Sequence, residues 1–164
     1  MIHQSAKPKI LIIGDAVVPS GFARVIRSIF EPLRNDYELH QLATRYDGRP
    51  HDYPWTLSAA GHDKSRYGYD RIVPLIEQIQ PAIVFLLYDI PFQLPYLEQL
   101  RKAKPQPKIV FYSPVESGPI GPEIVQGLHG VSRYVLFTEY GRREIAESLK
   151  SVRQQDAAFQ FPDL

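Results

Sequence analysis

The 164-residue sequence predicts an α/β protein built on a mostly parallel sheet. Five short segments rich in β-branched and aromatic residues recur along it, and four are apolar without alternation, which indicates strands buried on both faces. Helical patterns separate them, as in right-handed βαβ units. We therefore expect a single Rossmann-like αβα sandwich with strand order 3-2-1-4-5 and a long aromatic loop after strand two. The expected strands are 9–14, 37–43, 82–88, 108–112 and 134–137.

Apolar residues at helical spacing predict five helices between and after these strands. The first has an apolar stripe from Phe22 to Leu33 and follows Ser20, a favourable capping residue. The second covers 72–79, with Asp70 as its expected cap. The others lie near 96–100, 124–128 and 145–149. The 15 prolines fit abrupt helix starts and shaped loops rather than a simple helical bundle.

Composition excludes several classes of protein. Nineteen basic and 18 acidic residues give a net charge of +1, which does not favour binding to nucleic acid or a membrane surface. Cysteine is absent, so disulfides and thiolate metal sites are excluded. No apolar run approaches the ~18–20 residues of a membrane span, and the N-terminus lacks a signal-peptide core. We expect a cytoplasmic protein.

The chain length predicts one main domain. We assign 1–149 to a Rossmann-like domain. Residues 150–164 are polar without clear periodicity, and we expect them to form a C-terminal tail or a truncated interdomain connection.

The loop after the first strand is the sharpest candidate site, since ligands of open parallel sheets bind at the carboxyl ends of strands. Ser20 and Gly21 open a helix there, Phe22 follows, and Arg24 adds a positive charge in the first turn. Free N–H groups at a helix start suit a phosphate. The loop matches neither G-x-G-x-x-G nor the Walker pattern. It is therefore either an anion site or an ordinary serine-capped turn.

The segment 44–69 is long for a loop and rich in aromatic residues, among them Tyr46 and Trp55. Flat apolar rings with polar edges suit recognition of a sugar or polyol. Alternatively, these rings pack the loop onto the domain. His51 and His62 lack metal-ligand spacing, and we interpret them as surface residues.

Acidic and hydroxyl residues mark the ends of the later strands. Asp89 follows the third strand, Glu116 and Ser117 lie in the loop after the fourth, and Thr138 and Glu139 follow the fifth. A carboxylate there can act as a base or bind hydroxyl groups. Asp89 alternatively only caps the next helix.

Four passages together resemble a known family. They are PSGFARV at 19–25, YGYD at 67–70 with QPAIVF at 80–85, YSPVESGPI at 112–120, and YVLFTEYGR at 134–142. In this order and spacing they resemble the N-terminal, acceptor-side domain of GT-B glycosyltransferases of family GT4. The family's usual aspartate after Pro81 is alanine here, and the chain lacks the E-x7-E signature of the second domain.

The resemblance implies the acceptor-binding half of a retaining glycosyltransferase, inactive alone. It would transfer a sugar from a nucleoside-diphosphate sugar to a hydroxyl acceptor, without a metal or other cofactor, and would need a missing C-terminal Rossmann-like domain. Ser20, Gly21, Phe22 and Arg24 would face donor phosphates or substrate. The acceptor site would hold Tyr46, Trp55, Asp89, Glu116 and Ser117, with Thr138 and Glu139 on the rim.

Two other functions remain open. One is a stand-alone nucleotide- or sugar-binding module. The other is a receiver-like signalling domain, because Asp15, Asp89 and Ser113 follow the first, third and fourth expected strands. A receiver needs a second acid beside Asp15 and a lysine where Thr138 stands.

Overall fold

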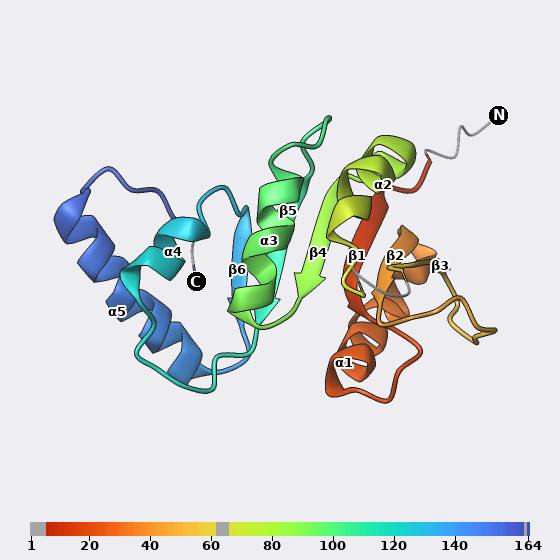
Figure 1. Ribbon diagram of the computed structural model, residues 1–164, viewed down its shortest axis with the longest axis horizontal. Helices are drawn as coiled ribbons and strands as arrows, with labels where there is room; N and C mark the ends of the chain where they lie inside the picture. Colours follow the sequence, from red (N-terminus) through yellow and green to blue (C-terminus); the bar gives the residue numbers. More distant parts are fainter. Residues whose placement is uncertain (1–5, 62–65, 163) are drawn as a thin grey trace.

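The computed structural model describes residues 6–61, 66–162 and 164, and places them in one α/β domain (Figure 1). Within this part of the chain, six parallel strands form one sheet in the order β3-β2-β1-β4-β5-β6. The strands are β1 (Lys9–Asp15), β2 (Glu38–Thr44), β3 (Thr56–Ala59), β4 (Ile83–Leu87), β5 (Lys108–Ser113) and β6 (Arg133–Leu136). The predicted fold class is thereby confirmed.

The strand order differs from the predicted one in the place of segment 82–88 and in one additional edge strand. The prediction placed segment 82–88 outside strand two, whereas β4 pairs directly with β1, Leu11 opposite Val84. Val84, Leu86 and Leu87 are fully buried, and a strand apolar on both faces belongs in the sheet centre. The edge beside β2 is taken by β3, a four-residue strand of partly exposed side chains inside the predicted aromatic loop.

All five predicted helices are present. They are α1 (Gly21–Phe30), α2 (Ile72–Ile79), α3 (Ile90–Leu100), α4 (Pro122–Gly127) and α5 (Glu139–Gln155), with short 3-10 helices η1 (Pro32–Asn35) and η2 (Tyr69–Arg71). Ser20 caps α1 by accepting from the Ala23 amide, as predicted. Asp70 does not cap α2, because it lies inside η2.

Helix α5 extends past the boundary expected at residue 149. Residues 150–155 continue the helix because Val152 adds another buried apolar position to its inner side. After the helix, the ring of Phe161 packs edge-on against Tyr134, with ring centroids 5.7 Å apart. The segment beyond residue 149 therefore contributes to the packing of the domain.

The two faces of the sheet are covered unequally. Alternate residues such as Leu11 and Phe111 face a large core shared with α2, α3, α4 and α5. The intervening residues, such as Ile12 and Phe85, face a smaller core whose helical members come from α1 and η1. Figure 1 shows α2 and α3 lying over one face of the sheet and α4 and α5 grouped beyond β6.

Packing explains the aromatic segment after β2. Tyr46 is 6% exposed and Trp55 is 8% exposed. The Trp55 indole donates to the Gln41 side-chain oxygen at 2.9 Å, and the Tyr46 hydroxyl donates to the Arg49 carbonyl. These rings hold the segment against the sheet. His62 lies outside the described residues.

No helix in the described ranges is long and apolar enough to cross a membrane.

Candidate functional site

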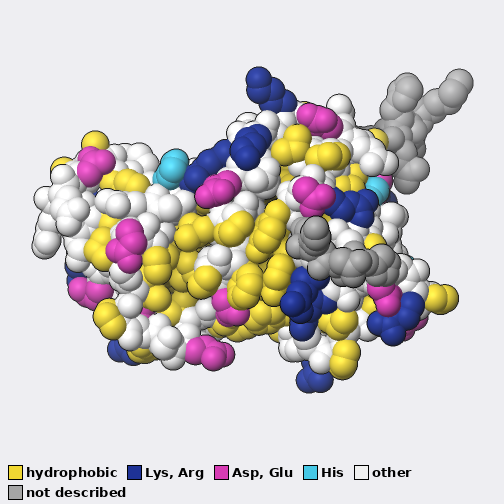
Figure 2. All heavy atoms as spheres, viewed as in Figure 1, with side chains coloured by type: hydrophobic (Ala, Val, Ile, Leu, Met, Phe, Trp, Pro, Cys, Tyr) yellow, Lys and Arg dark blue, Asp and Glu magenta, His cyan; other side chains and the backbone are white. Residues whose placement is uncertain are grey.

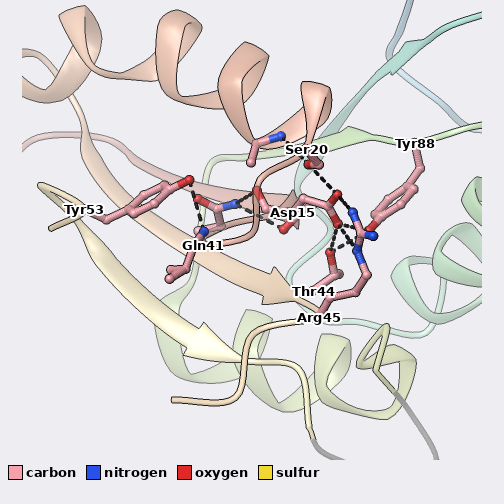
Figure 3. A network of polar contacts seen from close by, with 10 residues as sticks. Asp15, Ser20, Gln41, Thr44, Arg45, Tyr53 and Tyr88 are labelled. Carbon is pink, nitrogen blue, oxygen red and sulfur yellow. Dashed lines mark hydrogen bonds and ion pairs between the residues drawn. The ribbon is translucent and has the colours of Figure 1, made fainter. Parts of the chain in front are cut away.

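A buried carboxylate lies where the carboxyl ends of β1, β2 and β4 meet (Figure 3). Asp15 is the last residue of β1 and is fully buried. It accepts hydrogen bonds from the Ser20 hydroxyl at 2.7 Å and the Thr44 hydroxyl at 2.9 Å. The Tyr88 hydroxyl, just after β4, donates at 2.5 Å. Three strands and the first loop thus converge on one anion.

Arg45 completes this arrangement with a positive charge. Its Nε donates to Asp15 Oδ1 at 3.0 Å, and its Nη2 forms an ion pair with Oδ2. Arg45 follows β2 with φ +58°, a left-handed conformation that costs a non-glycine residue about 1 kcal/mol. Its backbone amide is held by the Arg66 carbonyl at 2.9 Å. The ion pair offsets this local strain.

The network keeps Asp15 ionised. Burial alone would raise the pKa of Asp15, but the hydrogen bonds from Arg45, Tyr88, Ser20 and Thr44 outweigh it and lower the pKa below its usual 3.8. Burial and the neighbouring carboxylate raise the pKa of Tyr88, so its hydroxyl stays a donor. Both Asp15 oxygens already have protein donors, and the guanidinium occupies the place of a neutralising cation.

The first loop brings Ser20, Gly21, Phe22 and Arg24 to the start of α1. Ser20 caps the helix and also binds Asp15, so its oxygen is committed to the fold. A Cβ at Gly21 would meet no atom within 4 Å, which leaves the backbone there open. Phe22 packs edge-on against Tyr88 at 5.7 Å. The exposed Arg24 lines a shallow hollow of about 260 Å³.

A second hollow, of about 310 Å³, lies beyond the carboxyl ends of β4 and β5. Its lining includes Asp89, Glu116 and Ser117. Its apolar lining includes Ile120 and Ile124, and Figure 2 shows apolar side chains gathered over α3 with acidic ones at their border. Burial, then the charge of Glu116, raises the pKa of Asp89. The Asp89 side chain makes no capping hydrogen bond to α3; its carbonyl accepts from the backbone instead.

The remaining predicted residues lie elsewhere. Thr138 caps α5 by accepting from the Gly141 amide at 3.1 Å, and Glu139 pairs with Arg142 at 2.5 Å. Both line a hollow of about 410 Å³ along β6. Tyr46 and Trp55 are buried near β2 and β3. The predicted residues therefore occupy separate places around the sheet and do not form one site.

Sequence reasoning missed the partners of Asp15. Thr44 and Tyr88 had a usable signal, since each follows an apolar strand at the position matching Asp15. Arg45 had none, because its role depends on a left-handed turn. A second buried network was also missed, in which Gln93 Nε2 donates to the Ser113 hydroxyl at 2.6 Å and that hydroxyl donates to Tyr134 at 2.9 Å.

Among the described residues, no three His, Cys, Asp or Glu side chains gather as metal ligands.

No family model matches the chain, and no curated protein does. Several solved structures are similar to it. A LuxR-family DNA-binding response regulator from Staphylococcus aureus is 18% identical, with a TM-score of 0.45 over 88% of this chain and 98% of that one. A signal receiver domain from Vibrio parahaemolyticus is 11% identical, with a TM-score of 0.48 over 95% and 100%. NtrX from Brucella abortus, in complex with ATP, is 15% identical, with a TM-score of 0.48 over 97% and 31%. At these identities and TM-scores the similarity carries no conclusion about function.

These comparisons contradict the resemblance to family GT4. The three solved structures named above are response-regulator proteins or receiver domains, and none of the three is a GT-B domain. The assignment as a glycosyltransferase half is therefore corrected. The expected sugar-nucleotide donor, hydroxyl acceptor and missing second Rossmann-like domain depended on that assignment and are withdrawn with it. The four passages that suggested the family lie at the boundaries of strands and helices, features that unrelated doubly wound folds share.

Proposed function

We propose that the chain is a receiver-like signalling module that acts by binding a partner and does not carry a phosphoryl group. Without the edge strand β3, the sheet order is β2-β1-β4-β5-β6, which corresponds to the flavodoxin-like order 2-1-3-4-5. Asp15 and Ser113 are the last residues of β1 and β5, and Asp89 lies two residues after the end of β4, the strand between them. This layout supports the receiver-like half of the proposal.

The ion pair between Arg45 and Asp15 is the observation that carries the other half. Phosphoryl transfer to a carboxylate depends on positive charge that neutralises the phosphoryl oxygens, commonly Mg²⁺ held by carboxylates. Here the Asp15 oxygens are bound by a guanidinium and three hydroxyls. Ser113 is fully buried in its own network, and Thr138 caps α5. A fixed internal pair thus replaces an exchangeable ion.

Incubation with acetyl phosphate and Mg²⁺, followed by intact-mass measurement, tests this proposal. We expect the wild-type chain to remain unmodified, with the Asp89→Asn variant as a matched control for adventitious labelling. A phosphoryl adduct on the wild-type chain that is absent from Asp89→Asn would refute the proposal.

A second candidate is binding of a phosphate-bearing ligand at the start of α1. It is favoured by the full strand order, which is that of nucleotide-binding sheets whose ligands lie at the switch point between β1 and β4. Gly21 leaves the helix start open, and Arg24 lies in the first turn. Calorimetric titration with pyrophosphate should give a saturable signal that Arg24→Gln and Gly21→Val both weaken. No signal with the wild-type chain would exclude this candidate.

A further inference from the structure

One sheet face carries half-buried and exposed apolar side chains beside α1, and we call this surface the open face. It consists of Ile83, Val110, Tyr112, Val135 and Phe137. Strand alternation separates them from the buried side: Val135 is 43% exposed, whereas the adjacent Tyr134 is 1% exposed. Phe137 is 37% exposed and packs on Tyr112, with ring centroids 4.2 Å apart. In the described chain, α1 is the only α-helix in this face's core.

Such a surface is unusual for a parallel sheet, whose two faces are normally both covered by helices. On the opposite side of the same strands, Ile109 is 4% exposed and Phe111 is fully buried beneath the other helices. Contiguous exposed apolar surface marks an interaction site. The open face is therefore a candidate for the surface through which a partner binds.

The open face has room for one helix. On its inner side, a hollow of about 270 Å³ lies beside α1 and β4 and is lined by Ile29, Leu33 and Ile83. On its outer side lies the hollow along β6. From β4 to β6 there are two strand spacings, about 10 Å in all. This width matches the diameter of an α-helix, about 10 Å.

The charged residues that β5 and β6 place on the open face are positive, and at its outer border Glu139 is paired with Arg142. Lys108 lies two residues before Val110, and Arg133 lies two residues before Val135. Because residues two apart in a strand share a face, both cations belong to the open face, and both are exposed. Strands β4, β5 and β6 contain no acidic residue. Both cations lie at the amino ends of their strands. A helix running antiparallel to the strands would place its partially negative carboxyl end there.

We propose that the open face binds a negatively charged amphipathic helix of a partner protein. This inference rests on the proposed binding role and names its surface. A second copy of the chain is disfavoured, because its own β4, β5 and β6 offer no acidic residue to pair with Lys108 and Arg133. A flat membrane is disfavoured, because α1 projects from the same side of the sheet and would keep a flat surface away from the apolar residues.

The experiment uses the full chain and two synthetic fluorescent helical peptides with the same leucine stripe, one with glutamate and one with lysine on the polar face. We expect the glutamate peptide to bind in the micromolar range and the lysine peptide about tenfold more weakly or worse. Val135→Asp should weaken binding of the glutamate peptide by about tenfold or more. Tyr140→Asp, at another exposed aromatic residue near the Gly118 loop, should leave it unchanged.

Charge reversal provides a variant that does not touch the apolar packing. Lys108→Glu with Arg133→Glu should reverse the preference between the two peptides, while circular dichroism checks that the fold is retained. Equal binding of both peptides, or no effect of Val135→Asp, would overturn the proposal. So would self-association that Val135→Asp abolishes, or tighter binding to anionic vesicles than to the glutamate peptide. No phosphoryl donor is involved, so this test and that of the proposed function can fail separately.

Discussion

Arg45 and Asp15 determine the chemistry at the centre of the sheet. The carboxylate has lost all contact with water, and its charge is tolerated because a guanidinium and three hydroxyls bind it. The Arg45 side chain is 42% exposed and that of Asp15 is not exposed at all, so the arginine lies between the carboxylate and the solvent. We therefore assign Asp15 a role in the stability of the fold rather than in a chemical reaction.

Removal of the guanidinium should destabilise the fold. Arg45→Ala leaves a buried carboxylate with three neutral donors, and we expect a loss of about 2 kcal/mol, within the range for hydrogen bonds to charged groups. The matched control is Arg49→Ala, which breaks an exposed pair with Asp47 and should cost less than about 1 kcal/mol. Urea unfolding at neutral pH measures both. Equal losses would contradict the role assigned to the Asp15 pair.

The same pair predicts a pH dependence. Because the pKa of folded Asp15 lies below its usual value, its contribution to stability is present above about pH 4 and is lost as the pH falls through the folded pKa. The stability difference between wild type and Arg45→Ala should therefore shrink on going from pH 7 to pH 3. Urea unfolding at the two pH values tests this. A difference that grows in acid would show that Asp15 is not the group that titrates.

At the scale of elements, the helix caps connect local structure to the site. Ser20 and Thr138 each cap a helix, but only Ser20 also donates to a buried carboxylate. Ser20→Ala should therefore cost more than Thr138→Ala, which should cost about 1 kcal/mol as an ordinary cap. Thermal unfolding of the two variants side by side provides the measurement. The ranking would be wrong if Thr138→Ala were the more destabilising change.

Two glycines near the site should respond in opposite directions to a methyl group. In Gly14→Ala the new Cβ would lie 2.5 Å from Ile26 Cδ1, so the packing of α1 must shift. In Gly21→Ala the Cβ enters open space at the start of α1 and should stabilise by up to about 1 kcal/mol. Chemical denaturation of both variants tests this contrast. A stable Gly14→Ala would mean that the β1–α1 contact is loose.

Some of these elements could be predicted from the sequence and some could not. The stripe from Phe22 to Leu33 and the apolar strands identified the helices, the sheet and the fold class, because periodicity reports burial directly. Strand β3 was not predicted, because four residues that are all at least partly exposed give no periodic pattern of apolar residues. The site was predicted only in outline: the strand ends were identified, but the pairing of Asp15 depends on a left-handed Arg45.

At the scale of the whole molecule, the unequal covering of the sheet is the feature that most constrains function. It could not be predicted, because a continuous apolar strand shows that both faces favour burial without showing which helix covers which face. The placement of α5 with α2, α3 and α4 leaves Val135 and Phe137 exposed at the far edge. The molecule thus combines a closed centre at Asp15 with an open apolar face at β5 and β6.

Binding of a partner through the open face, without phosphorylation of the chain, can be tested in a single NMR titration. The ¹⁵N-labelled full chain is titrated with the glutamate peptide, with and without acetyl phosphate and Mg²⁺, while amide shifts are followed by NMR. We expect saturable shifts at Val110, Val135 and Phe137 that are the same under both conditions. Shifts that appear only with acetyl phosphate, or that centre on Asp89 and Glu116, would contradict this proposal.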